Sequence, residues 1–285
     1  MVDAERRNVT DGRVPGPDGP PDVCHAFAGL IARRPDLRLD LRWAPSLRST
    51  MDVVAAAGEA GAPQGLIVGA ETQTDGRGRR GRRWSSPPGA GLYFSYLARP
   101  TRGLGLLTLA AGVAVRAGIA RATGLFPDLK WPNDLFLGAR KVAGLLAEGA
   151  RVGTPEAAIT LGVGINVRPA AFPPDVGGRA TCLEAEAGRT VDRGLVLAAV
   201  VEELCDTLAS LSAGTADGIL HAWRAASPSA EGARVEWLDG EVVCAGVTAG
   251  VDSTGALLVQ TPTRLERIIA GELTWHLVSG RPGRP

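Results

Sequence analysis

The stretch Gly76-Arg-Gly-Arg-Arg-Gly-Arg-Arg83 places three glycines and five arginines in eight residues. The elements expected before and after this stretch decide which fold the sequence predicts. Glycine lets the backbone take left-handed conformations and approach a ligand closely. Arginine carries a permanent charge on a planar group that can bind a phosphate or a carboxylate at two points. The stretch therefore predicts a loop that closes over an anion.

Residues 76–81 also match the spacing Gly-x-Gly-x-x-Gly of dinucleotide-binding folds. That spacing requires a helix that begins within it, so that the helix N-terminus meets the pyrophosphate. Here the chain continues through Trp84-Ser-Ser-Pro-Pro88 into the apolar segment 91–98, which is typical of a strand. A Rossmann fold is therefore disfavoured. A Walker loop is disfavoured too, because the sequence contains no Gly-Lys-Ser or Gly-Lys-Thr.

Composition limits the remaining classes of function. The chain has 285 residues and is 45% hydrophobic, enough for a large core and more than one folded unit. Its net charge of +1 argues against a nucleic-acid-binding surface, since the basic residues cluster only in the glycine–arginine stretch. We expect no apolar run of the roughly 18 to 20 residues that span a membrane. With no apolar signal region at the N-terminus, we expect a cytoplasmic location.

The cysteines indicate neither a disulfide framework nor a zinc site. Cys24, Cys182, Cys205 and Cys244 lie far apart, and no Cys-x-x-Cys pair is present. We therefore expect free thiols, and the sequence identifies no metal ligand with certainty.

Hydrophobic patterns predict an α+β fold with a mixed sheet flanked by helices. Strands are expected at 37–43, 65–70, 91–98, 135–137, 142–148 and 157–167, with helices at 23–32, after Ser49, and at 104–123, 191–213 and 215–226. Residues 170–180 are rich in proline and glycine and predict a loop. Beyond Pro228 only short strands are expected, at 233–238, 241–249, 256–260 and about 264–278, with a hairpin signal at Asp239-Gly240. We predict a disordered leader (1–22), a main domain (23–228) and a small C-terminal β-barrel (229–285).

Lysine is rare in this chain. Of 31 basic residues, Lys130 and Lys141 are the two lysines, so both are candidates for a task that a guanidinium cannot perform. Joining a carboxylate to a nucleotide phosphate brings two anions together, and cations must neutralise them while water is excluded. The arginine loop and Lys141, as a point charge beside the new anhydride, would meet these needs. A solvated turn lysine is the open alternative.

Three further motifs have both a ligand-binding and a structural interpretation. Ser49-Thr-Met-Asp52 fits a helix capping box, although its hydroxyls could also contact a ligand. Gly162 and Gly164 near the end of a strand indicate close approach of a ligand or a bulge, and Asn166 offers an amide to a ribose or base. Asp134 could orient a cation or the nearby lysines, or cap a turn.

Taken together, these motifs resemble the biotin protein ligase family (biotin–[acetyl-CoA-carboxylase] ligase). The resemblance runs from about Trp43 to Val278 and rests on these motifs in order: Ser49-Thr50, Gln73, Gly76 to Arg82, Lys130-Trp-Pro-Asn-Asp134, Arg140-Lys-Val-Ala-Gly144, Gly162-x-Gly-Ile-Asn166 and Gly271-Glu-Leu273. It implies a catalytic domain like that of class II aminoacyl-tRNA synthetases and lipoate ligases, followed by an SH3-like barrel. It also implies a two-step reaction in which biotin and MgATP give biotinyl-5′-AMP and pyrophosphate, and a lysine of a biotin carboxyl carrier domain then attacks the adenylate.

The resemblance also implies roles for individual residues. The biotin site would comprise Ser49, Thr50, Gln73, Gly76, Arg77, Gly78, Arg79, Lys141, Gly144, Gly162 and Gly164. The ATP site would comprise Arg79, Arg80, Arg82, Trp84, Lys130, Asn133, Asp134, Lys141 and Asn166, with Trp84 near the adenine. Lys141, Arg77 and Arg79 would act on the reacting carboxylate and phosphate.

Two alternatives remain from the sequence. A lipoate–protein ligase shares the implied fold and the lysine, but the glycine–arginine loop and the Gly162-x-Gly-Ile-Asn166 strand favour biotin. A DNA-binding repressor of the same family would need a winged helix-turn-helix, for which the residues before Trp43 leave little room. We therefore expect a carboxylase carrier domain as partner, with neither DNA nor a membrane.

Overall fold

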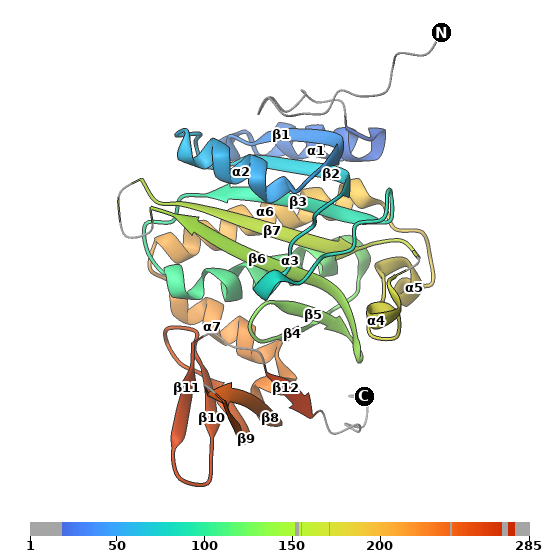
Figure 1. The fold of residues 1–285 in the computed structure, drawn as a ribbon. Coiled ribbons are helices and arrows are strands. Elements are labelled where there is room, and N and C mark those ends of the chain that lie inside the picture. Colours follow the sequence, from blue (N-terminus) through green and yellow to red (C-terminus); the bar gives the residue numbers. More distant parts are fainter. Residues whose placement is uncertain are drawn as a thin grey trace.

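The computed structural model describes residues 19–151, 154, 156–170, 172–239, 241–269 and 273–276. A large mixed sheet with helices on both faces forms the main body, and a smaller antiparallel sheet follows it at the C-terminal end (Figure 1). Most of the predicted leader, residues 1–18, lies outside the described residues. The first helix, α1 (Pro21–Arg33), begins two residues before the helix start expected at residue 23, and the leader boundary at about residue 22 stays a prediction.

The main sheet has seven strands in the order β1-β2-β3-β7-β6-β5-β4. Strands β1 and β2 pair in parallel, and every other neighbouring pair in this sheet is antiparallel. The strands are β1 (Asp40–Leu47), β2 (Leu66–Gln73), β3 (Gly91–Ala98), β4 (Asp128–Lys130), β5 (Asp134–Leu137), β6 (Arg140–Ala150) and β7 (Ala158–Asn166).

Helices cover the two faces of this sheet unequally. Alternate side chains of a strand point to opposite faces, so neighbouring residues of one strand show what covers each face. On β2, Ile67 belongs to a large core shared with α1, α3 (Leu107–Thr123), α6 (Arg193–Ser212) and α7 (Ala216–Ala225). Its neighbour Val68 belongs to a smaller core under α2 (Thr50–Glu59). Among the described residues α2 is the helix that packs on this second core, so this face keeps room for a site.

The segment Leu104–Thr123 is long and apolar enough to cross a membrane, so the expectation that no such run exists was wrong. Its short 3-10 turn, Leu104–Leu106, leads into α3. More than half of its most apolar window is buried. A Cβ on Gly118 would lie 2.5 Å from Cα of Val200 in α6, so the two helices pack closely. The apolar character of this helix is explained by burial within the fold.

The C-terminal sheet is antiparallel, with strand order β11-β10-β9-β8-β12. Its strands are β8 (Glu231–Asp239), β9 (Val242–Val251), β10 (Leu257–Gln260), β11 (Leu265–Ile268) and β12 (Thr274–His276). The single last strand predicted at 264–278 corresponds to β11 and β12, and residues 277–278 lie outside the described residues. The division at residue 228 stays a prediction.

Several short elements differ from the expectation. Strand β4 was not predicted, and neither were the short helices α4 (Pro174–Gly177) and α5 (Leu183–Ala187). Strand β1 begins at Asp40 instead of residue 37, because Pro35–Leu37 form a 3-10 turn and Arg38 takes a left-handed conformation with φ 45°. Such short elements depend on tertiary partners more than on their own composition.

Candidate active site

The predicted site residues converge on the face of the main sheet that carries α2. They come from the start of α2, the end of β2, the glycine–arginine loop, the β5–β6 hairpin and strand β7, with Lys130 on β4 and Asn133 in the β4–β5 turn beside them (Figure 1). Strands β6 and β7 are neighbours, with Gly144 directly opposite Gly164. Motifs up to about 115 residues apart in sequence (Ser49 to Gly164) therefore lie on one surface.

A buried polar cluster marks the end near α2. The side-chain oxygen of Gln73 accepts hydrogen bonds from the Thr50 backbone N–H at 2.9 Å and from its hydroxyl at 3.2 Å. The Gln73 amide donates to Ser86 Oγ at 3.2 Å, and the hydroxyls of Thr50 and Ser95 lie 2.8 Å apart. Ser49 caps α2 by accepting from the backbone N–H of the residue after Thr50, at 3.3 Å. The cluster offers amide and hydroxyl groups to a polar ligand head.

Next to this cluster, the Trp84 indole lies against the glycines of the sheet. A Cβ on Gly164 would lie 2.4 Å from the indole, and one on Gly144 would lie 3.1 Å from it. Only glycine at position 164 allows this approach. The indole Nε1 is buried and has no hydrogen-bond partner among the described residues. Trp84 was predicted near the adenine, but it lies against glycines that were assigned to the biotin pocket.

Other glycines of the motifs make room for protein atoms. A Cβ on Gly162 would lie 2.7 Å from the sulfur of Met51, which reaches across from α2. A Cβ on Gly76 would lie 2.5 Å from the backbone oxygen of Trp84, and the Trp84 N–H donates to the Gly76 carbonyl at 2.8 Å. Gly78 N–H donates to the carbonyl of Arg82 at 2.7 Å, which closes the loop on itself.

Lys141 lies at the other end of the glycine surface. Its Nζ is 2.6 Å from Oδ1 of Asp134 and 5.4 Å from the centroid of a Trp84 ring. A Cβ on Gly144 would lie 3.1 Å from Nζ. The backbone of Lys141 also pairs with the loop before α5, donating to the Arg179 carbonyl at 2.8 Å. The ammonium is thus fixed beside the glycine and tryptophan surface.

The four loop arginines that were predicted to bind ligand divide into three kinds. Arg77 pairs with Asp52 at 3.0 Å and with Glu148 at 3.5 Å, so it is already held by carboxylates. Arg79 is half-buried and makes no side-chain hydrogen bond or ion pair among the described residues. Burial lowers its pKa, and the charge of Arg80 lowers it further. Arg80 and Arg82 are exposed, and the turn at Arg80 is left-handed with φ 56°.

Arg79 lines a cavity of about 220 Å³ between the main body and the C-terminal sheet. Thr108 of α3, Asn133 and Gly255 also line it. The side-chain amide of Asn133 donates to the carbonyl of Leu145 at 2.5 Å. A cation that is unpaired within the described residues and faces a cavity is available to an anion.

The remaining predicted residues lie around this surface. Asn166 is buried, and its amide donates to the Thr181 carbonyl at 3.0 Å. This hydrogen bond connects β7 to the loop before α5. Lys130 lies on β4 between two aromatic rings. In the motif Gly271-Glu-Leu273, Gly271 and Glu272 lie outside the described residues, and Leu273 packs against the core.

Sequence reasoning missed Ser86, Ser95 and Glu148. Ser95 could have been found, because it is the one hydroxyl-bearing side chain besides tyrosine in the otherwise apolar segment 91–98. In the structure this side chain is fully buried. Glu148 carries no such signal, since its contact with Arg77 depends on the loop crossing strand β6.

No group of three or more His, Cys, Asp or Glu side chains that could hold a metal ion occurs in the described part of the chain. The carboxylates nearest the site are already paired with cations: Asp134 with Lys141, and Asp52 with Arg77. These residues offer no ready metal cage of their own.

Comparisons with known proteins agree on one family. The Biotin/lipoate A/B protein ligase family model matches residues 43–166. The bifunctional ligase/repressor BirA of Bacillus subtilis is 32% identical over 240 residues, which cover 80% of this chain and 71% of that protein. The biotin–[acetyl-CoA-carboxylase] ligase of Mycobacterium tuberculosis is 31% identical over 245 residues, which cover 79% of this chain and 84% of that protein.

The structure of this chain also resembles solved structures of biotin protein ligases. The biotin protein ligase from Aquifex aeolicus, solved in complex with biotin and ATP, superposes with a TM-score of 0.72 at 30% identity. The match covers 83% of this chain and 98% of that chain. The predicted fold class, a mixed sheet with helices followed by a second β-sheet consistent with an SH3-like barrel, is confirmed.

Proposed function

The chain belongs to the biotin/lipoate A/B protein ligase family, within its biotin protein ligases, and we propose that it is itself a biotin–protein ligase. In the first step a biotin carboxylate oxygen attacks the α-phosphorus of ATP, and the bond to pyrophosphate breaks. In the second step a carrier lysine amine attacks the acyl carbon of biotinyl-5′-AMP, an amide forms and AMP leaves.

One observation carries this proposal. At Gly144 the apolar surface of glycines and Trp84 meets the Lys141 ammonium, because an added Cβ would lie 3.1 Å from both. A ligand with an apolar body and a terminal carboxylate fits such a junction. Its carboxylate would end beside a cation that is oriented by Asp134.

The polar cluster of Thr50, Gln73 and Ser95 supports the other end of the same ligand. A ureido head has two N–H donors and one carbonyl acceptor, and amide and hydroxyl side chains can match both. A buried N–H without a partner is costly, so the Trp84 Nε1 is a further group that a bound ligand could satisfy.

The arginine loop supports the adenylation step. Arg79 has no hydrogen bond or ion pair from its side chain within the described residues and faces a cavity, so we assign it to the anionic intermediate. We assign Arg80, Arg82, Lys130, Asn133 and Asn166 to the nucleotide. Magnesium would enter with the ATP phosphates, as it usually keeps several waters and few protein ligands.

The partner we propose is the biotin carboxyl carrier domain of a biotin-dependent carboxylase. A cytoplasmic location stays a prediction. The absence of DNA and membrane partners also stays a prediction, and the net charge of +1 supports it for DNA.

The decisive experiment supplies the purified protein with MgATP and either biotin or lipoate, and detects acyl-AMP by mass spectrometry. We expect biotinyl-AMP with biotin and no adenylate with lipoate. Lipoyl-AMP alone would favour the lipoate ligase alternative, and no adenylate with either acid would refute the proposal. Adding a carrier domain then tests transfer as a mass increase on its lysine.

A further inference from the structure

Lys130 is held between aromatic rings from two separate parts of the chain. Its Nζ lies 4.9 Å from the ring centroid of Phe136, on the neighbouring strand β5. It lies 5.1 Å from a ring centroid of Trp275, on β12 of the C-terminal sheet. A cation is attracted to the face of an aromatic ring at such distances. The C-terminal sheet thus contributes one side chain to the surroundings of a predicted nucleotide-binding residue.

The ammonium has no stronger partner in the part of the chain that the structure describes. Within the described residues, Lys130 makes no hydrogen bond and no ion pair. Burial lowers its pKa, the carboxylate of Asp134 acts in the opposite direction, and the charge of Lys141 lowers the pKa further. Asp134 is nearby, but its Oδ1 forms an ion pair with Nζ of Lys141 at 2.6 Å. The three N–H donors of Lys130 therefore remain available to an anion.

Two lysines compete for one carboxylate in this arrangement. If Lys130 were free to rotate, its flexible side chain could pair with Asp134 and displace Lys141. The two rings offer the Lys130 ammonium a position away from the carboxylate. They thereby keep Lys141 at the glycine surface and leave both cations available to ligand.

Several contacts near Lys130 join the C-terminal sheet to the main body. The indole N–H of Trp131 donates to the Gly255 carbonyl at 3.0 Å, within the buried interior. Arg224 of α7 donates to the Val251 carbonyl at 2.7 Å. Strand β12 pairs with β8, where Trp275 lies opposite Val235. The position of Trp275 relative to Lys130 is therefore fixed through the backbone of the C-terminal sheet.

We propose that Trp275 is a positioning residue for adenylation: its ring, with that of Phe136, holds the Lys130 ammonium toward the phosphates of ATP. This inference rests on the proposed function and on the assignment of Lys130 to the nucleotide. The C-terminal sheet is then part of the adenylation site through one side chain.

Steady-state kinetics of biotinyl-AMP formation by the full chain test this proposal. Trp275→Ala should raise KM for ATP by roughly 3- to 30-fold, the range of a cation–π contact, and leave KM for biotin unchanged. Trp275→Phe should restore KM for ATP to near the wild-type value. Trp275→Leu keeps apolar volume without a π face, so it should behave like the alanine variant and serves if that variant does not fold.

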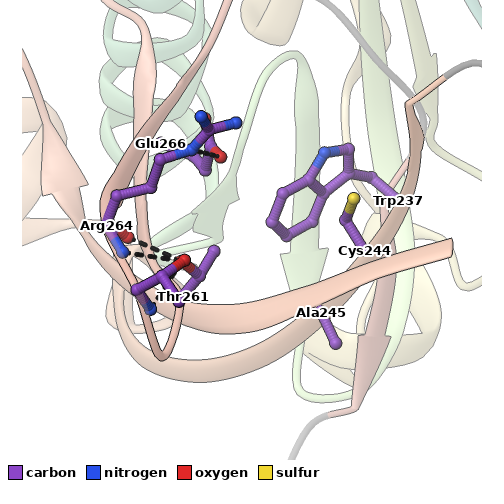
Figure 2. A pocket seen from close by; sticks show the side chains of 7 residues that line it. Trp237, Cys244, Ala245, Thr261, Arg264 and Glu266 are labelled. Atoms are coloured by element: carbon purple, nitrogen blue, oxygen red, sulfur yellow. Dashed lines mark hydrogen bonds and ion pairs between the residues drawn. The ribbon is translucent and has the colours of Figure 1, made fainter. Parts of the chain in front are cut away.

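Trp237 provides a matched control in the same sheet. It lies on β8 and lines an open pocket of about 300 Å³ with Cys244, Thr261, Arg264 and Glu266 (Figure 2). Trp237→Ala removes a tryptophan from the same sheet without touching Lys130. We expect it to change thermal stability and leave KM for ATP unchanged.

A double mutant separates positioning from general damage. In a Lys130→Met background, Trp275→Ala should have no further effect on KM for ATP, because the group it positions is absent. Additive effects would overturn the proposal, and so would a wild-type KM for ATP in Trp275→Leu or equal losses in Trp275→Ala and Trp237→Ala. Failure of the proposed function is distinguishable, since the wild type itself would then form no biotinyl-AMP.

Discussion

Replacing Gly164 by alanine tests whether β7 carries glycine so that the Trp84 indole can lie against the sheet. The added Cβ would lie 2.4 Å from Cε2, 2.6 Å from Cζ2 and 2.7 Å from Nε1 of that indole. Carbon atoms in contact are about 3.5 to 4.0 Å apart, so the ring must retreat by roughly 1 Å. The indole is rigid, and its backbone is tied to Gly76 by a hydrogen bond of 2.8 Å. The retreat therefore strains the loop as well.

Inserting a methyl group into packed surroundings costs about 1 to 3 kcal/mol. If the displaced indole narrows the biotin pocket, this cost appears as a loss of biotin affinity of roughly 5- to 150-fold. Isothermal titration with biotin in the absence of ATP measures it. Thermal unfolding of the ligand-free protein shows how much of the cost falls on the fold instead.

The control for Gly164→Ala is Gly218→Ala in α7, where an added Cβ meets nothing within 4 Å. It should bind biotin like the wild type. Adding Trp84→Phe to Gly164→Ala replaces the indole by a smaller ring and should recover part of the affinity. Wild-type biotin binding by Gly164→Ala alone would show that Trp84 and Gly164 do not shape the pocket.

Three further predictions follow from charged groups. Lys141→Ala should slow biotinyl-AMP formation by roughly 10²- to 10³-fold in rapid-quench assays with a modest loss of biotin binding; an unchanged rate would exclude it from the mechanism. Arg79→Ala should speed release of biotinyl-AMP, and equal dissociation rates would contradict a closing loop. Burial raises the pKa of Asp252, but hydrogen bonds from Thr254 and Arg267 lower it to about 2. Because the folded pKa lies below the ordinary 3.8, the stability that the carboxylate contributes is present above that pH and is lost toward pH 2. Asp252→Asn should therefore lower the unfolding free energy at pH 7 by about 1 kcal/mol after solvent screening, and denaturant titrations should find the difference vanishing toward pH 2.

Long buried strands were predictable from the sequence, and short ones were not. All eight residues of β3 (Gly91–Ala98) are buried, and its bounds match the prediction, because a continuous apolar run between breakers has few other solutions. Strand β4 (Asp128–Lys130) has three residues and exists because it pairs with β5. Its stability comes from a partner that local composition does not reveal.

The candidate site was likewise predictable in part: its motif residues could be identified from the sequence, but some of their contacts could not. Motif spacing identified Gly144, Gly164 and Lys141 as candidates, and the fold brings them together. It did not reveal which face of the sheet Trp84 covers, because that depends on how the loop returns after Arg83. The contact of Trp275 with Lys130 joins residues 145 positions apart and has no local signal at either end.

The two lysines of this chain occupy positions whose geometry favours an ammonium over a guanidinium. Lys141 fits between Gly144 and Trp84, where an added Cβ at Gly144 would already lie 3.1 Å from its Nζ. Lys130 fits between the rings of Phe136 and Trp275. A guanidinium is broader and carries five donors in a fixed plane, so in either place it would need more space and more acceptors. A compact ammonium can instead approach Asp134 from one side and leave its other donors free. In a sequence that otherwise uses arginine, lysine persists where a point charge must fit against glycine or aromatic surfaces.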